Sequence, residues 1–214
     1  WCILGCGKGD IGVEMAATTG SADKPADFLS EGKRLLADSR YTEAHAAFVK
    51  AYSQDPNTAE TCAGLGRTYL AWGHWDEAID WYRKAAAIEK EIPTAEFALG
   101  NVYFKLDRYD EAEAAFLESL KLDSTYVPAM RSLGAAYSKQ GHYEAALVQY
   151  RNALVLKPDH ISTLFNFGLV NFRLGQNDEA ISALKRVKTL SPHFAPANFV
   201  IGEVFVKEND TEQA

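Results

Sequence analysis

The sequence predicts an all-α chain built from repeated pairs of helices. Three observations support this fold class: glycine and alanine recur every 34 residues, prolines occur only near the ends of these segments, and apolar residues follow helical spacing between them. Hydrophobic residues make up 47% of the 214 residues, which is enough to bury a sizeable core. The net charge of -7 argues against general binding to nucleic acid.

Small residues mark the repeat. Residues at the same position of successive units form a column when the units are aligned. The glycine column contains Gly32, Gly66, Gly100, Gly134, Gly168 and Gly202. The alanine column, 12 residues later, contains Ala44, Ala78, Ala112, Ala146, Ala180 and Ala214. We expect the two helices of each unit to approach closely at these columns. A larger side chain there would separate the helices, at a cost of about 1 to 3 kcal/mol.

Prolines and turn-forming residues give the ends of the helices. Pro25, Pro93, Pro128 and Pro196 begin units, and Pro56, Pro158 and Pro192 end them, as expected for a residue that breaks helix interiors. Residues that accept a turn or left-handed conformation lie halfway along each unit: Ser39, Gly73, Asp107, Gly141, Gly175 and Asn209. Each unit is therefore predicted to be a helix, a short turn and a second helix.

The period divides the chain into a leader and a repeat region. Residues 1–24 are expected to be a disordered tether, and residues 25–214 to contain the units 25–58, 59–92, 93–126, 127–160, 161–194 and the partial unit 195–214. In the fourth unit Met130, Leu133, Gly134 and Tyr137 follow the i, i+3, i+4, i+7 spacing of one helix face.

The fourth unit also carries a family pattern, which consists of Leu133-Gly134, Tyr137, Tyr143, Ala146, Tyr150, Ala153 and Pro158. It resembles the tetratricopeptide repeat, and the resemblance extends over residues 25–214. The resemblance implies a right-handed solenoid of antiparallel helix pairs, about six units long, with a concave face lined by the first helices. Asn171 and Asn177 replace aromatic residues of the pattern, and we expect them to weaken packing without moving the register.

The resemblance implies that the concave face holds an extended peptide or a partner's helix. The basic residues expected there are Lys33, Arg67, Lys105, Arg131, Lys139, Arg173 and Lys207, against the acidic Glu60 and Glu203. The other residues expected there are Phe97, Asn101, Phe104, Phe165, Phe172 and Phe199.

We expect this groove to bind a partner segment that carries acidic or C-terminal carboxylate groups and apolar anchors. Arg67, Arg131 and Arg173 are expected to bind the carboxylates. The alternative is a solvated basic face with several of the Phe side chains wedged between units.

Two groove types known in the family do not match. The carboxylate clamp of chaperone co-factors needs Lys and Asn one turn apart, but Phe97 precedes Asn101. The asparagine ladder of the nuclear glycosyltransferases is absent, since its column reads Ser30, Gly64, Ala98, Ser132, Asn166 and Val200. Stacking of single-stranded RNA in the groove is disfavoured by the acidic total charge.

No catalytic, metal or cofactor site is predicted. The histidines His45, His74, His142, His160 and His193 lack metal-ligand spacing, and we interpret them as exposed turn residues. Cys62 is expected to be a buried small hydrophobe rather than a nucleophile. The chain is therefore not expected to be an enzyme.

The leader supports two resemblances. Gly7, Gly9 and Gly12 match the G-x-G-x-x-G loop of nucleotide-binding or methyltransferase folds, but a repeat that begins at Pro25 leaves no room for that domain. Ile3-Leu4-Gly5-Cys6 resembles a bacterial lipobox, which would be acylated on Cys6. Since the chain begins with Trp1, we interpret the preceding apolar segment of such a signal as missing from the sequence.

We therefore predict a non-catalytic interaction scaffold, lipid-anchored in the periplasm of a bacterial cell envelope. A cytoplasmic location is the alternative. The alternative function is the recognition or regulatory arm of a larger enzyme, such as a glycosyltransferase or methyltransferase, that continues beyond Ala214.

Overall fold

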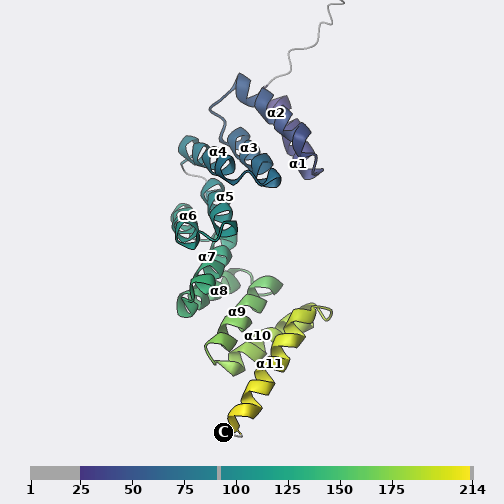
Figure 1. Cartoon of the computed structure of the whole chain (residues 1–214), viewed down its shortest axis with the longest axis vertical. Helices are drawn as coiled ribbons and strands as arrows, with labels where there is room; N and C mark the ends of the chain where they lie inside the picture. The colour runs from purple at the N-terminus through teal and green to yellow at the C-terminus, as the bar shows by residue number, and fades with distance from the viewer. Residues whose placement is uncertain (1–24, 91–92, 213–214) are drawn as a thin grey trace, which may run out of the picture.

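A computed structural model describes residues 25–90 and 93–212, and these residues form helices joined by short loops (Figure 1). In chain order the helices are α1 (Pro25–Ala37), α2 (Tyr41–Gln54), α3 (Ala59–Trp72), α4 (Trp75–Ile88), α5 (Pro93–Lys105), α6 (Tyr109–Leu122), α7 (Val127–Gln140), α8 (Tyr143–Leu156), α9 (Ile161–Arg173), α10 (Asn177–Leu190) and α11 (Ala195–Glu212). The odd-numbered helices begin 34 residues apart, in register with the glycine column.

The helices form a curved stack, which confirms the predicted all-α solenoid. Each helix packs against the helices before and after it in the chain. The odd-numbered helices also contact one another along the stack, with α3 and α5 meeting in the buried cluster of Ala59, Cys62 and Ala95. The described even-numbered helices make no comparable contacts. The stack is therefore tighter on the odd-numbered side, and Figure 1 shows α1, α3 and α5 on the side toward which it curves. The first helices of the units line the concave face.

The turns within the first five units share one hydrogen-bonding pattern. At Gly73, Gly141 and Gly175 the backbone has φ between 75° and 82°, and at Ser39 and Asp107 φ is 59° and 56°. The next backbone N–H donates to the carbonyl five residues earlier, as from His74 to Tyr69 at 3.0 Å in the second unit. This pairing is the Schellman motif, which satisfies the last carbonyls of the first helix while the chain reverses.

The turn predicted at Asn209 does not form, because α11 continues through it to Glu212. In the other units a second helix folds back over the first, and the turn residue makes that reversal possible. No second helix follows α11 within the described residues, so nothing competes with further helical hydrogen bonding. The predicted proline positions are confirmed: Pro25 and Pro93 start α1 and α5, and Pro128 lies in the first turn of α7.

The glycine column is where the second helix places a large side chain against the first. A Cβ atom on Gly100 would lie 2.5 Å from Phe116 Cε1, and one on Gly134 would lie 2.7 Å from Tyr150 Cε1. The alanines of the second column are completely buried from Ala44 to Ala180. The prediction that these columns permit close approach is therefore confirmed for the five complete units.

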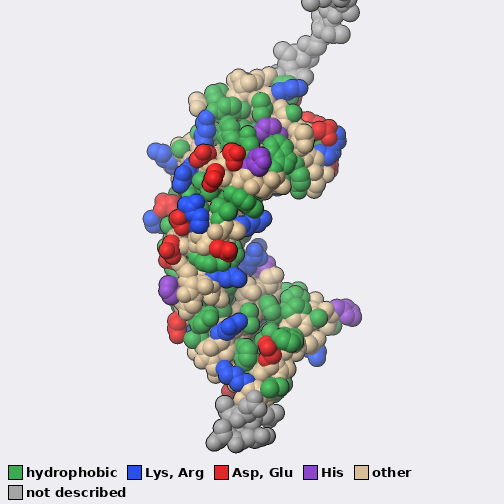
Figure 2. All heavy atoms as spheres, viewed as in Figure 1, with side chains coloured by type: hydrophobic (Ala, Val, Ile, Leu, Met, Phe, Trp, Pro, Cys, Tyr) green, Lys and Arg blue, Asp and Glu red, His purple; other side chains and the backbone are tan. Residues whose placement is uncertain are grey.

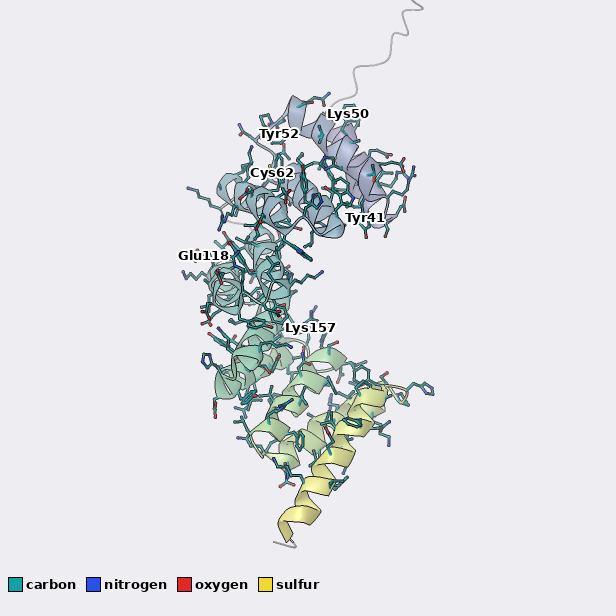
Figure 3. All side chains as sticks on the ribbon, in the orientation of Figure 1. Tyr41, Lys50, Tyr52, Cys62, Glu118 and Lys157 are labelled. Atoms are coloured by element: carbon teal, nitrogen blue, oxygen red, sulfur yellow. The ribbon has the colours of Figure 1, made fainter. Side chains whose placement is uncertain are left out.

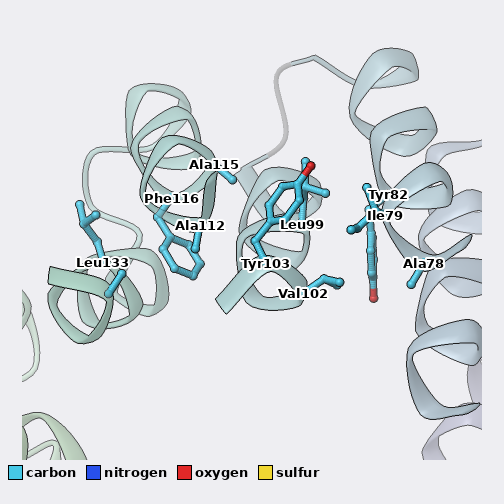
Figure 4. Close-up of a cluster of buried hydrophobic side chains, with 11 residues drawn as sticks. Ala78, Ile79, Tyr82, Leu99, Val102, Tyr103, Ala112, Ala115, Phe116 and Leu133 are labelled. Atoms are coloured by element: carbon cyan, nitrogen blue, oxygen red, sulfur yellow. The ribbon is translucent and has the colours of Figure 1, made fainter. Parts of the chain in front are cut away.

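The same large side chains also join consecutive units. Phe48 is almost fully buried and lies against Gly32 of its own unit and Gly64 of the next, where an added Cβ would lie 2.5 Å from its Cε1 atom. Figure 4 shows the equivalent layers further along, where Tyr82 and Phe116 pack with residues of α5 and α7. In the first and third units, one ring therefore contributes to packing both within the unit and across the junction.

The fifth unit keeps its register despite its two asparagines. Asn171 is fully buried, and its Nδ2 donates to the Phe167 carbonyl at 2.8 Å. No protein partner is found for Oδ1 of either Asn171 or Asn177. A buried acceptor without a hydrogen bond costs about 1 to 3 kcal/mol, so this unit is expected to be less stable than its neighbours.

Replacing Gly100 with alanine is expected to destabilise the protein. The added methyl overlaps Phe116, and this overlap costs about 1 to 3 kcal/mol. Alanine favours the helix over glycine by only about 1 kcal/mol, so the net effect is a loss of stability. Gly202→Ala in the same column is the matched control, since no atom lies within 4 Å of its Cβ position. Urea titration should show a lower unfolding midpoint for Gly100→Ala and an equal or higher one for Gly202→Ala. Equal midpoints for the two variants would contradict this packing argument.

Candidate functional site

The concave face is hollowed between successive first helices. Pockets of about 230, 170 and 610 Å³ lie between α3 and α5, between α7 and α9, and between α9 and α11. Figure 2 shows blue Lys and Arg side chains along the hollow of the stack. Pockets at this spacing could accept side chains of an extended ligand that crosses the first helices one after another.

Three of the predicted basic residues are exposed and have no ion pair among the described side chains: Arg67, Lys139 and Arg173. Lys139 lies at the edge of the pocket between α7 and α9, next to Asn166. In this part of the molecule their charges are free to meet a ligand.

The other basic residues already contact protein groups. Lys33 Nζ lies 2.6 Å from Glu60 Oε2, an exposed ion pair between α1 and α3. Lys105 Nζ lies 5.9 Å from the ring centre of Trp75, and Lys207 Nζ lies 5.2 Å from that of Phe172. Contact with an aromatic ring restricts the positions of the Lys105 and Lys207 ammonium groups and leaves their charge uncompensated by these rings. In contrast, Lys33 and Glu60 offset each other's charge.

Most of the predicted phenylalanines are half-buried against aromatic rings of their own unit. Phe97 packs on Phe116 and Tyr126, and Phe165 packs on Phe194. Phe104 is half-buried against Tyr109.

The aromatic surface of the groove is concentrated at its C-terminal end. Phe199 is 68% exposed and lies with the half-buried Phe172 in the pocket between α9 and α11. Val206, which the sequence analysis did not select, lines the same pocket and is 62% exposed. Asn101 is half-buried on α5, outside these three pockets.

Arg131 contacts the His160 side chain across a unit junction. Its Nη1 lies 2.9 Å from Nε2 of His160, whose Nδ1 lies 2.9 Å from the hydroxyl of Thr163. The Thr163 backbone N–H also donates to Nδ1 at 3.3 Å, so a donor faces each ring nitrogen, and a neutral imidazole can accept at only one of them. Burial and the positive charges of Arg131 and Lys157 lower the pKa of His160. Arg131 therefore joins α7 to the start of α9 and is less available for reading a carboxylate.

The interpretation of all five histidines as exposed turn residues is wrong for His45 and His160. His45 lies within α2, half-buried, with Nδ1 3.1 Å from Thr68 Oγ1 and its ring 4.9 Å from that of Trp72. Its burial lowers its pKa. His45 lies on the second helix, where a half-buried polar residue can hydrogen-bond to the next unit, and His160 directly precedes α9. Within the described residues no group of three His, Cys, Asp or Glu side chains could hold a metal ion.

Cys62 is completely buried in α3, as predicted, and burial raises the pKa of its thiol. A buried thiol that resists ionisation is a packing residue rather than a nucleophile. Cys6 and the Gly7, Gly9, Gly12 motif lie outside the described residues. No helix in the described part of the chain is both long and apolar enough to cross a membrane.

Four family models match the chain. Models described as tetratricopeptide repeat match residues 26–91, 93–126 and 161–194, and a model described as TPR repeat matches residues 134–175. No curated protein sequence matches the chain.

Solved structures give similar folds. The MamA protein is 26% identical, with a TM-score of 0.68 over 80% of this chain and 94% of that one. YrrB, titled a TPR protein with an unusual peptide-binding site, is 21% identical, with a TM-score of 0.68 over 83% of this chain and 91% of that one. A thermophilic TPR protein of Thermus thermophilus, TTC0263, is 20% identical, with a TM-score of 0.66 over 86% of this chain and all of that one.

Stability is expected to fall as the pH is lowered from 7.5 to 5.5. The pKa values of His45 and His160 are lower in the folded protein than their ordinary value of 6.5, so the unfolded chain binds more protons as the pH falls through 6.5. Their contribution is complete above that pH and decreases below it. Urea titrations across this range should show a smaller decrease in the unfolding free energy for His160→Asn than for the wild-type protein. An equally steep decrease in that variant would contradict the assignment to His160.

Proposed function

This chain belongs to the tetratricopeptide repeat family, and we propose that it is a non-catalytic scaffold whose concave face binds an extended, acidic segment of a partner protein. The observation that carries the proposal is the set of exposed cations on the first helices, Arg67, Lys139 and Arg173, together with Lys105 and Lys207 over aromatic rings. YrrB, with its titled peptide-binding site, gives a precedent for peptide binding on a similar fold.

The charge pattern supports an acidic ligand. The whole chain carries a net charge of -7, yet the cations along the concave face are opposed there by Glu89, Glu203 and the Glu60 that Lys33 already pairs. Because opposite charges attract over about 8 to 10 Å at physiological salt, an acidic segment would be drawn to this face rather than to the outer one.

The pocket between α9 and α11 supports an apolar anchor in the same ligand. Phe199 and Val206 are exposed there, beside Lys207 on the Phe172 ring. An aromatic or aliphatic side chain would cover this apolar surface while a neighbouring carboxylate meets Lys207. The groove therefore suits a segment in which an apolar residue lies beside acidic ones.

The lipobox resemblance of Ile3-Leu4-Gly5-Cys6 supports a second proposal, that the scaffold is tethered to a bacterial envelope membrane through Cys6. The alternative of a recognition arm of a larger enzyme predicts a catalytic domain encoded downstream of Ala214. Reading the neighbouring coding sequence separates these proposals.

A double charge reversal, Lys139→Glu with Arg173→Glu, is expected to weaken acidic-peptide binding at least about tenfold, because each reversal replaces an attraction with a repulsion. The probe is a fluorescein-labelled eight-residue peptide with a central Phe and four Glu, and fluorescence anisotropy measures its affinity. An isosteric peptide with Gln in place of Glu should bind more weakly than the Glu peptide to the wild-type protein.

Lys185→Glu with Lys188→Glu is the matched control, because both lysines are exposed on the second helix α10 and the change in net charge is the same. This variant should keep most of the wild-type affinity. Equal losses in the two double variants would mean that overall charge, and not the concave face, attracts the peptide.

Acylation of Cys6 is expected in the full-length product made in a bacterium with its natural upstream sequence. Intact-mass spectrometry should show the added mass of acyl chains, and Cys6→Ser should lose both this mass and the membrane association. A soluble, unmodified full-length product would contradict the tether.

A further inference from the structure

A separate pocket lies on the outer side of the stack, between the second helices α8 and α10. It has a volume of about 430 Å³, and its apolar wall consists of Leu154 from α8, Leu164 and Phe167 from α9, and Ala183 from α10. Because the second helices form the outer layer, this pocket lies on a different face from the groove between the first helices.

The repeat provides an internal comparison for this pocket. Three periods of 34 residues are 102 residues, so Leu154, Ala183 and Arg186 correspond to Tyr52, Trp81 and Lys84 at the junction of the first two units. There the rings of Tyr52 and Trp81 pack edge to face, with their centres 5.0 Å apart. Tyr52 packs against the buried cluster that contains Cys62, the counterpart of Leu164, and Figure 3 labels both residues.

A cation lies over those rings at the first junction. Lys84 Nζ lies 4.5 Å from the ring centre of Tyr52 and 5.3 Å from that of Trp81, and it also donates a hydrogen bond to the Tyr52 hydroxyl. This junction is therefore filled by two aromatic rings below one basic side chain.

At the junction of the fourth and fifth units the two rings are missing. Leucine and alanine replace Tyr52 and Trp81, and the larger Leu164 and Phe167 in place of Cys62 and Leu65 restore only part of the lost volume. Arg186 remains at the edge of the pocket, where its Nε donates to Asp159 Oδ1 at 2.9 Å. The cation is retained, but the rings that it would cover are not.

The opposite edge of the pocket is acidic. Asp178 and Glu179 lie in the first turn of α10 and line the pocket, and both are exposed. No basic side chain pairs with either of them in the described part of the chain. A positive charge placed beside an occupant of the pocket would meet these carboxylates.

We propose that this outer pocket binds a Trp or Tyr side chain of a partner protein, with a basic residue next to that aromatic residue. The ring would take the place that Trp81 occupies at the first junction, and Arg186 would lie over it as Lys84 does there. Trp and Tyr are the residues that most often supply binding energy at interfaces, because they bury a large area with few rotatable bonds. The proposal concerns a face other than the concave groove, so it does not depend on the proposed function.

The test uses the full chain with methyl-labelled Ala and Leu, and nuclear magnetic resonance follows the methyl signals of Ala183, Leu154 and Leu164. The probe is the capped tripeptide Lys-Trp-Lys, compared with Glu-Trp-Glu. We expect saturable shifts of these signals and an affinity for the Lys peptide about threefold to tenfold higher. Absence of saturable shifts, or equal affinity for both peptides, would overturn the proposal.

Two variants give independent checks. Ala183→Trp copies Trp81 and fills the pocket, so it should lower the affinity for Lys-Trp-Lys at least about tenfold. Asp178→Asn with Glu179→Gln changes only exposed carboxylates, should fold normally, and should abolish the preference for the Lys peptide. A preference that survives this second variant would overturn the proposal even if Ala183→Trp fails to fold.

The groove variant Lys139→Glu with Arg173→Glu separates the two faces. Its affinity for Lys-Trp-Lys should stay within about twofold of the wild-type value, because its changed residues lie on first helices and not on the outer pocket. If the groove variant alone changes Lys-Trp-Lys binding, the peptide occupies the concave face and the outer pocket is excluded. Failure of the acidic peptide to bind the groove leaves this result unaffected.

Discussion

The contact between one large side chain of each second helix and the glycine of the first helix controls the geometry of the whole stack. Phe48 and Phe116 lie so close to these glycines that an added Cβ would lie 2.5 to 2.7 Å from the nearest ring carbon. Phe48 also reaches Gly64, so a single ring sets the spacing within a unit and the contact with the next. The curvature of the stack, and with it the concave face, depends on this repeated close approach.

This constraint divides the molecule into two faces with different chemistry. First helices approach one another on the inner side, where exposed cations such as Lys139 and Arg173 follow the 34-residue period. Second helices are further apart on the outer side, so a junction there must be filled by large side chains such as Tyr52 and Trp81. Where the sequence does not supply them, as at Ala183, a pocket remains.

Stability is not uniform along the stack, because each unit contacts mainly its neighbours. The fifth unit contains two asparagines at positions that are aromatic in the second, third and fourth units, with buried oxygens that have no protein partner. It also contains Ala183 beside the outer pocket and Gly168, which packs on Leu184 rather than on a ring. The proposed outer site therefore lies in the part of the stack where packing is least complete, and a ligand there would add contacts that the unit lacks.

The sequence alone determined the fold, the register and nearly all helix ends, because these depend on local features. Glycine or a short polar residue permits the reversal at each turn, proline excludes helix interiors, and the two small columns admit a close neighbour. The turn at Asn209 was wrongly predicted because a permissive residue allows a reversal but does not require one; a second helix must pack back. Only the tertiary structure decided which cations stay available: Lys33 pairs with Glu60 and Arg131 with His160, whereas Arg173 does not pair among the described side chains. Those pairings, like the pockets, depend on how side chains from different units meet across a junction, and the period of the sequence does not specify that geometry.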